Sequence, residues 1–331
     1  MQGEGEIKVD KTDKTEKNKK IRPTAPHVAL GIALFLIGGE LLTVGIAERG
    51  EMYASGIAFL VACLLVGAAA PAASAIFGIK NIRSAGTLPH KLAFVLFGTF
   101  ASAAAVWVAL SEATELTDFA ERVMHLGTPR WMVFLLFLAF SAFVGARGVR
   151  TVKKFALVSF ALVGAAVAVL LLMSIPLLER ENLSLGGAER LDLGLAARIF
   201  VGRFAPLGVA LAYFGFESGD GRGESKGAHS LTPLSATLGA VIGGALLILC
   251  YFNVTLLLGS ELARGEEYPY SAAVGAISAG KLFMRMEALS YATYFLASAL
   301  RTSVAVGTVL EFVGRVLVLE KRQPSDEENE K

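Results

Sequence analysis

Charged residues interrupt apolar segments at two places where a lipid bilayer would penalise them. Glu40 follows Gly38 and Gly39 within an apolar run, and Arg285 and Glu287 lie in a second apolar stretch. A charge at the centre of a membrane-spanning helix costs about 2.5–3.5 kcal/mol, so Glu40 should face a bundle interior, a hydrated cavity or a basic partner, or be protonated. The two glycines favour either close helix packing or a locally unwound helix whose free backbone groups bind something.

A second candidate interruption lies near Pro206, with Gly202 and Gly208 close by. Proline removes a backbone hydrogen bond and clashes with the preceding turn. In hydrocarbon such a break is tolerated only where protein or a water-lined cavity covers it. The segments containing Glu40 and Pro206 are five predicted spans apart, which is the spacing of an inverted five-plus-five repeat with binding at the facing breaks.

Polar residues near the end of the chain recur at helical spacing and form one stripe. They are Glu287, Tyr291, Tyr294, Ser298, Arg301 and Thr302. We expect this stripe to face other helices, and we expect Arg301 to be paired in the interior because it lies deep in its span. Glu311 and Arg315 are one helical turn apart and predict an ordinary ion pair on the helix surface.

These residues must be positioned by membrane-spanning helices. The composition is 54% hydrophobic and 18% charged, with a mean hydropathy of +0.58, which indicates an integral membrane protein. Apolar runs of about 17–25 residues, enough to cross a bilayer, recur along the chain. They predict eight spans, at residues 28–47, 52–79, 92–111, 131–146, 155–178, 195–216, 231–260 and 288–310. The predicted fold is an all-α membrane bundle at 25–319, between disordered cytoplasmic tails at 1–24 and 320–331.

Lysine and arginine predict the orientation. They concentrate in the amino-terminal tail and in the predicted connections at 80–91 and 147–154, whereas the connection at 112–130 is acidic. Both termini should therefore be cytoplasmic. The sequence contains no nucleotide-binding loop, zinc-ligand spacing or convincing catalytic triad, so we expect no enzyme activity, cofactor, metal or nucleic-acid partner. Cys63 and Cys250 lie in separate apolar spans and are expected to be small apolar filler.

Four short motifs resemble one family of membrane proteins. They are Thr128-Pro129, Ala146-Arg147-Gly148-Val149-Arg150, Phe214-Gly215-Phe216-Glu217 and Arg285-Met286-Glu287. In this order and spacing they resemble the spore germination permeases, which are the integral B subunits of nutrient germinant receptors. That family belongs to the amino acid, polyamine and organocation transporter superfamily. The resemblance covers residues 25–318, and Arg301 falls where many members have lysine.

The resemblance implies ten helices in two inverted halves, with a small-molecule site at the broken first and sixth helices. The residues that match the two breaks, and would bind substrate, are Gly38, Gly39, Glu40, Thr43, Phe214, Gly215 and Glu217. Those with an expected structural or coupling role are Pro206, Arg285, Glu287, Tyr291 and Arg301. With eight spans the chain would be a truncated version of this fold. Residues 218–227 are hydrophilic where the family continues with an apolar half-helix, so the second break either lies at Pro206 and Gly208 or is damaged.

The expected function is that of a receptor subunit in the inner spore membrane or the cell membrane. It would bind a small nutrient, an amino acid, and signal germination through other receptor subunits. One alternative is a proton-coupled amino acid transporter in which Glu40 or Glu217 carries the proton. The other is an assembly protein that binds no solute. The expected partners are membrane lipid, the nutrient and the other receptor subunits.

Overall fold

The computed structural model describes residues 25–41, 51–78, 87–124, 127–179, 182, 193–217, 231–278 and 286–317, and every regular element in them is a helix. The α-helices are α1 (Ala25–Glu40), α2 (Glu51–Phe77), α3 (Leu88–Arg122), α4 (Arg130–Ala146), α5 (Val149–Ser174), α6 (Leu193–Ile199), α7 (Leu207–Glu217), α8 (Pro233–Gly265), α9 (Pro269–Ser278) and α10 (Met286–Leu317). A 3-10 helix at Ile175–Leu177 follows α5, and a π-helix at Phe200–Phe204 follows α6.

Five of the described helices, α2, α3, α5, α8 and α10, are long and apolar enough to cross a membrane. The bent pair α6 and α7 is a sixth candidate, and α1 and α4 are shorter apolar helices of 16 and 17 residues. Large apolar side chains such as Leu64, Phe100 and Trp131 are exposed on the outside of the bundle, as expected of surfaces that contact lipid. The chain is therefore an all-helical integral membrane protein. Each of the eight predicted spans overlaps one of these helices or the bent pair, and the ten-helix repeat stays a prediction.

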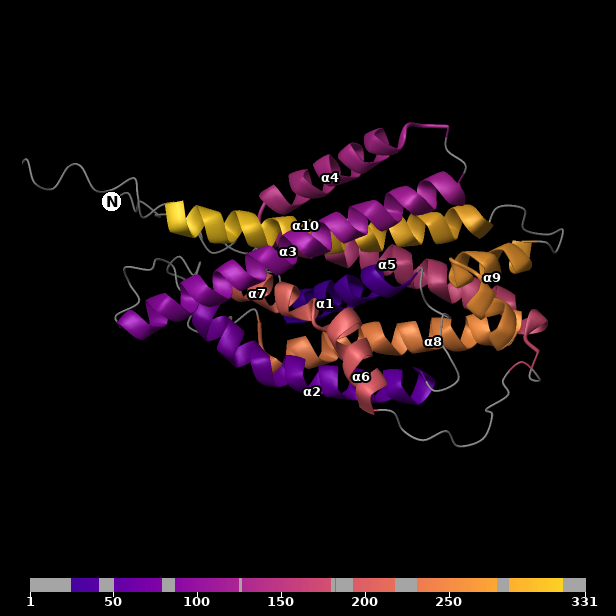
Figure 1. Cartoon of the computed structure of the whole chain (residues 1–331), viewed down its shortest axis with the longest axis horizontal. Helices are drawn as coiled ribbons and strands as arrows, with labels where there is room; N and C mark the ends of the chain where they lie inside the picture. Colours follow the sequence, from indigo (N-terminus) through magenta and orange to yellow (C-terminus); the bar gives the residue numbers. More distant parts are fainter. Residues whose placement is uncertain are drawn as a thin grey trace, which may run out of the picture.

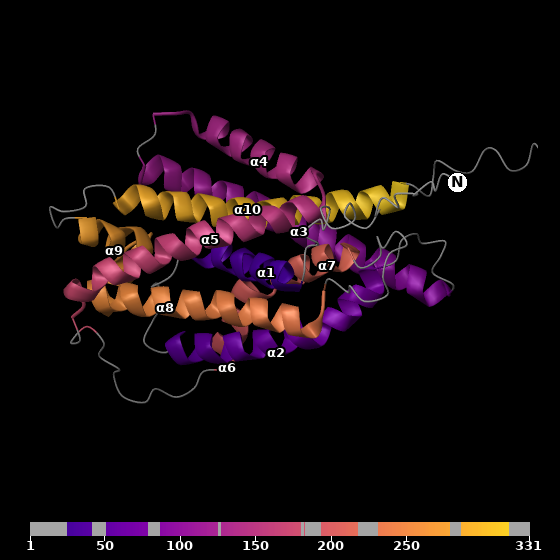
Figure 2. The same ribbon diagram turned by 180° about the vertical axis from the view of Figure 1, so that it is seen from behind.

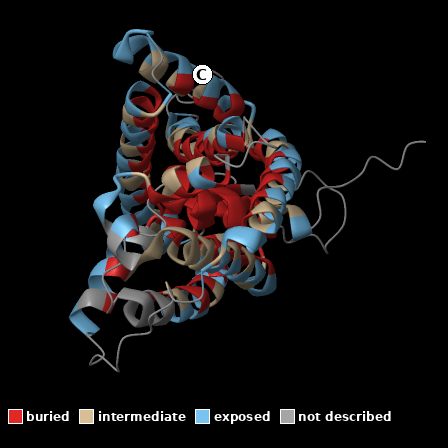
Figure 3. Cartoon of the chain, turned by 90° about the vertical axis from the view of Figure 1, so that its right-hand side faces the viewer, coloured by how far each residue is buried: buried red, intermediate tan, exposed pale blue. Residues whose placement is uncertain are grey.

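Helix α1 lies in the middle of the bundle, where it packs against α5, α7, α8 and α10 (Figures 1 and 2). The buried residues gather around it, and the exposed residues lie on the outer helices (Figure 3). Its contact with α8 depends on Gly239 and Gly243. A Cβ atom at these positions would lie 2.5 Å from the Ala29 carbonyl oxygen and 2.7 Å from that of Ala33, respectively. Small residues thus let the two backbones approach closely, as in many membrane bundles.

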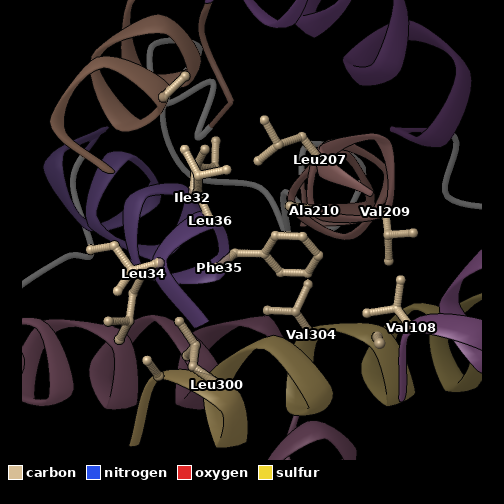
Figure 4. Close-up of a cluster of buried hydrophobic side chains, with 14 of the residues drawn as sticks. Ile32, Leu34, Phe35, Leu36, Val108, Leu207, Val209, Ala210, Leu300 and Val304 are labelled. Atoms are coloured by element: carbon tan, nitrogen blue, oxygen red, sulfur yellow. The ribbon is translucent and has the colours of Figure 1, made fainter. Parts of the chain in front are cut away.

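Phe35 joins α1 to the helices around it. Its ring lies between α7 and α10, near Ala210 and Val304 (Figure 4). At the start of α7, three residues before Ala210, Leu207 lies beside the same stretch of α1, and Phe35 itself is 1% exposed. This apolar layer fixes α1 against both α7 and α10, and so positions the polar residues at the end of α1.

The segment around Pro206 is interrupted, as the sequence predicts. The two apolar helices on either side of it meet at 41°. Between them, the Ala205 amide donates to the Phe200 carbonyl at 3.0 Å, which is the wider turn of a π-helix. Because proline has no amide hydrogen and clashes with the preceding turn, the helix cannot continue unchanged through Pro206.

Helix α8 also has a kink, which the sequence analysis did not anticipate. Gly259 has a φ of 77°, a left-handed conformation that favours glycine. The Leu256 carbonyl, one turn earlier, accepts hydrogen bonds from the Glu179 amide at 3.2 Å and from Asn182 Nδ2 at 3.1 Å. Residues that follow α5 thus satisfy a backbone group near the kink.

Two predicted connections are wrong, because the helices beside them are longer than their apolar runs. The acidic residues from Glu112 to Glu121 belong to the last turns of α3, which ends at Arg122. Similarly, Lys153 and Lys154 lie in α5, and the Lys153 side chain is fully buried. Glutamate and lysine are good helix formers, so a helix can continue beyond the apolar run that predicts it.

Candidate functional site

A buried ion pair joins α10 to α3. Arg301 Nε lies 3.1 Å from Glu112 Oε1, and the two side chains are only 7% and 3% exposed. The sequence prediction that Arg301 is paired in the interior is confirmed. Helix α10 positions the arginine through the polar stripe, of which Tyr294, Ser298 and Thr302 are also buried. A charge pair this deep is retained only where each partner neutralises the other.

The end of α1 lies directly under the arginine. A Cβ atom at Gly39 would be 0.8 Å from Arg301 Nη1, and one at Gly38 would be 2.5 Å from the Ala297 carbonyl oxygen. Ser298 Oγ donates to the Gly38 carbonyl at 3.2 Å. Both glycines lie within α1, so of the two alternatives close packing is correct and unwinding at these residues is not.

Glu40 is the last residue of α1 and is 8% exposed. It lies within electrostatic range of Glu112, so a second buried carboxylate is close to the ion pair. Phe35 covers the arginine from another side, with its ring centre 5.2 Å from Arg301 Cζ. The prediction that Glu40 faces the bundle interior is confirmed.

Several polar atoms around this pair have no hydrogen-bond partner among the residues that the structure describes. They are Glu112 Oε2, the Tyr294 hydroxyl and Thr302 Oγ1. We name the six residues of this cluster the polar centre: Glu40, Glu112, Tyr294, Ser298, Arg301 and Thr302. Unpaired buried polar atoms also occur elsewhere in the described part of the bundle, for example at Ser141 and Ser159, so it is the charge pair beside them that distinguishes this locus as a place for a further polar molecule or proton.

The interruption at Pro206 lies beside α1. The π-helix Phe200–Phe204 and α7 both contact α1. A Cβ atom at Gly31 would lie 2.6 Å from the ring of Phe214, which is fully buried. Leu207, at the start of α7, lies beside the later part of α1 (Figure 4). The two helices therefore run in opposite directions, which brings the end of α1 toward the bend before α7.

Comparison of the chain with models of protein families and with curated proteins found no match. The all-helical membrane architecture therefore rests on the helices themselves. Among the described residues, no group of three or more His, Cys, Asp or Glu side chains is placed to hold a metal ion. What the site offers is one guanidinium, two carboxylates and three hydroxyl groups in a buried setting.

Of the other predicted site residues that the structure describes, Gly215 does not join the polar centre. Gly215 lies inside α7 and packs on α2, where a Cβ atom would be 3.0 Å from the Ala73 carbonyl oxygen. The second break is thus at Pro206 and not at Gly215. Glu217 ends α7, but its side chain lies outside the described part of the chain, as do Thr43 and Arg285.

Two residues of the predicted stripe lie at its outer end. Glu287 is exposed, but it still faces a neighbouring helix, since its Oε1 would lie 3.6 Å from a Cβ atom at Gly275 of α9. Tyr291 is half-buried, and its ring centre is 5.3 Å from that of Phe119 on α3. The stripe thus turns inward only as α10 passes deeper into the bundle.

Sequence reasoning missed Glu112, although a signal for it was available. Ala105, Val108, Ala109 and Glu112 follow one another at helical spacing, and all four are buried. That periodicity continues past the apolar run and places Glu112 on the inner face of α3. The residue was assigned to a connection because charge alone was used to end the span.

A second, partly buried arginine lies further along α10. Arg315 donates from Nη2 to the Phe216 carbonyl at 2.6 Å and from Nη1 to the Phe77 carbonyl at 3.3 Å. Its Cζ also lies 4.9 Å from the centre of the Phe216 ring. The predicted pair of Glu311 and Arg315 is confirmed at 3.6 Å, but it is partly buried and not fully on the surface, with side chains 31% and 13% exposed. We name this arrangement the Arg315 clasp, because it connects the ends of α2 and α7 to α10.

Proposed function

We propose that this protein is the membrane subunit of a germinant receptor of the spore germination permease type, which binds an amino acid and signals through other receptor subunits. The observation that supports this proposal is the buried charge pair of Arg301 and Glu112, which lies beside the end of α1. Ionisable residues inside a membrane bundle commonly mark sites for polar solutes or ions, because the surrounding helices shield their charges from lipid. The motif resemblance gives the biological setting, in the inner spore membrane or the cell membrane.

The polar centre is suited to a ligand that has charges of both signs. Arg301 can hold a carboxylate, and Glu40 and Glu112 can hold an ammonium group. In a low-dielectric site these interactions are stronger than in water, so a small ligand with few atoms can still bind measurably. An amino acid satisfies both requirements.

The direct test is equilibrium binding of radiolabelled amino acids to the purified full-length protein in lipid nanodiscs. We expect saturable binding of at least one amino acid, weakened about tenfold or more by Glu40→Gln. Glu311→Gln, on α10 but outside the polar centre, is the matched control and should bind normally. Absence of saturable binding for every amino acid would reject the proposal.

Transport and assembly functions are separated by two further measurements. Proteoliposomes should bind the amino acid without concentrating it; uptake that responds to an imposed pH gradient would instead favour a proton-coupled transporter. Purification from native membranes should recover other receptor subunits. If those subunits are recovered but changes in the polar centre leave both binding and germination unaltered, the protein is an assembly subunit.

A further inference from the structure

We infer that Arg301 is the residue that binds the carboxylate of the ligand, and that Glu112 occupies Arg301 until the ligand displaces it. This inference rests on the proposed function and assigns the ligand's acidic group to α10 and α3 rather than to the interrupted helices. Ligand binding would then exchange one carboxylate for another at a single guanidinium. It would also release Glu112 within the bundle.

Arg301 and Glu112 are not in the strongest geometry that a guanidinium and a carboxylate can adopt. A guanidinium can hold both oxygens of a carboxylate through two parallel hydrogen bonds, which is its strongest arrangement. Here only Oε1 of Glu112 lies against Arg301 Nε, while Oε2 has no hydrogen-bond partner in the described ranges of the chain. A carboxylate that is not tied to α3 can adopt the paired geometry that Glu112 does not.

Two buried hydroxyl groups on α10 can bind such a ligand. Tyr294 and Thr302 are 1% and 0% exposed, and neither hydroxyl has a hydrogen-bond partner among the described residues. Both lie on the buried stretch of α10 that contains Arg301, within two turns of it along the helix. A hydroxyl is a donor as well as an acceptor, so each can donate to a ligand oxygen. Buried groups without partners are costly, and a bound carboxylate would remove that cost.

The fate of Glu112 defines the class of ligand. Once it loses Arg301, Glu112 becomes an unpaired carboxylate in the interior, which is strongly unfavourable. A ligand that brings an ammonium group close to its own carboxylate neutralises Glu112 in the same step. The site should therefore select small zwitterions and reject simple carboxylates and simple amines.

This exchange predicts opposite behaviour for two variants. Arg301→Gln should weaken amino acid binding about 100-fold, because it removes the group that holds the carboxylate. Glu112→Ala should instead open the site to a carboxylate without an ammonium group, since no displaced acid needs neutralising. We expect acetate to bind Glu112→Ala at least about tenfold more tightly than it binds the wild-type protein.

The experiment measures acetate, ethylammonium and the amino acid that the wild type binds, each by the shift in melting temperature of the full chain in phosphatidylcholine nanodiscs. Acetate should stabilise Glu112→Ala and leave both the wild type and Glu311→Ala unchanged. If Glu112→Ala does not fold, Glu112→Gln keeps the side-chain volume and should show the same gain. A repeat with phosphatidylserine in the nanodisc tests the lipid headgroup, which has the same carboxylate; stabilisation of Glu112→Ala by that lipid without acetate would overturn the assignment to a soluble ligand.

Failure here differs from failure of the proposed function. If the wild type binds no amino acid, the proposed function falls. If the wild type binds an amino acid and Arg301→Gln binds it equally well, or if acetate stabilises Glu112→Ala no more than the wild type, the exchange is refuted and the receptor proposal stands.

Discussion

Helix α10 contains two arginines whose partners differ. Arg301 lies against a buried carboxylate, Glu112 of α3, at 3.1 Å. Arg315, fourteen residues or about 21 Å further along the helix, has a carboxylate neighbour on its own helix, Glu311 at 3.6 Å, and donates in addition to the backbone carbonyls of Phe77 and Phe216. One guanidinium thus pairs with a side chain of another helix, and the other connects its own helix to the ends of two other helices.

The difference indicates which site can change state. The carbonyls that Arg315 holds are fixed in the last turns of α2 and α7, where a cation is favoured by the helix dipole and by unsatisfied backbone acceptors. Arg301 depends on a single flexible side chain, whose second oxygen lacks a partner among the described residues. We therefore expect the Arg315 clasp to be structural and the Arg301 pair to be exchangeable.

The largest effect should come from leaving Arg301 without its carboxylate. Glu112→Ala is expected to destabilise the protein by about 3–5 kcal/mol, because it creates an unpaired buried charge. The double variant Glu112→Leu with Arg301→Met should have nearly wild-type stability and bind no ligand. Unfolding can be followed with a thiol-reactive dye, since Cys63 and Cys250 are both buried. Equal losses in the single and double variants would show that charge is not the cause.

Removing the Arg315 clasp should have the next largest effect. Arg315→Ala leaves two helix-end carbonyls without their charged donor, for an expected loss of about 2–3 kcal/mol. Glu311→Ala should cost less than about 1 kcal/mol, because the carboxylate is partly exposed and its pair is not the main contact. The same thermal assay measures both variants. A larger loss for Glu311→Ala would mean that the ion pair, and not the carbonyls, holds Arg315.

Gly39→Ala should disturb Arg301 without removing it. The added methyl group overlaps the guanidinium and should cost about 1–3 kcal/mol through overpacking. Gly164→Ala is the matched control, because nothing lies within 4 Å of its Cβ position. The loss at Gly39 should shrink when Arg301→Ala is also present, which a double-mutant cycle in thermal unfolding measures. Additive losses would place the clash elsewhere.

The smallest effect is expected at an exposed ion pair, that of Arg122 and Glu267, whose side chains are each 56% exposed. Glu267→Gln should change the melting temperature only slightly at low salt and not at all at high salt, because solvent ions screen such a pair. Comparison of its salt dependence with that of Glu112→Ala sharpens the contrast, since the buried pair should be insensitive to salt. A salt-sensitive Glu112→Ala would indicate that water reaches the polar centre.

Much of the architecture could be predicted from local sequence. Apolar runs located the helices because the bilayer sets a minimum hydrophobic length. Pro206 located the interruption, because proline removes a backbone hydrogen bond and clashes with the preceding turn, although α2 continues through Pro71. The lengths of α3 and α5 could not be read in this way, since glutamate and lysine continue a helix beyond its apolar part.

Only one of the two residues of the buried ion pair could be predicted from the sequence. The spacing of the α10 stripe was enough to place Arg301 in the interior. Its partner was not predictable, because Glu112 lies on a helix far away in the chain and only packing brings the two together. For Arg315, the spacing predicted the pair with Glu311, but the carbonyls from α2 and α7 that it also binds could not be predicted, for the same reason.

By itself the sequence determined that the chain forms apolar helices, where one of them breaks, and which face of α10 is polar, because these properties depend on neighbours within a few turns. Only the tertiary structure decided that Gly38 and Gly39 serve close packing, that Glu112 meets Arg301, and that Arg315 holds two helix ends. The spacing of residues predicts which face of a helix is polar. Which groups it meets there depends on the packing of helices that are distant in sequence.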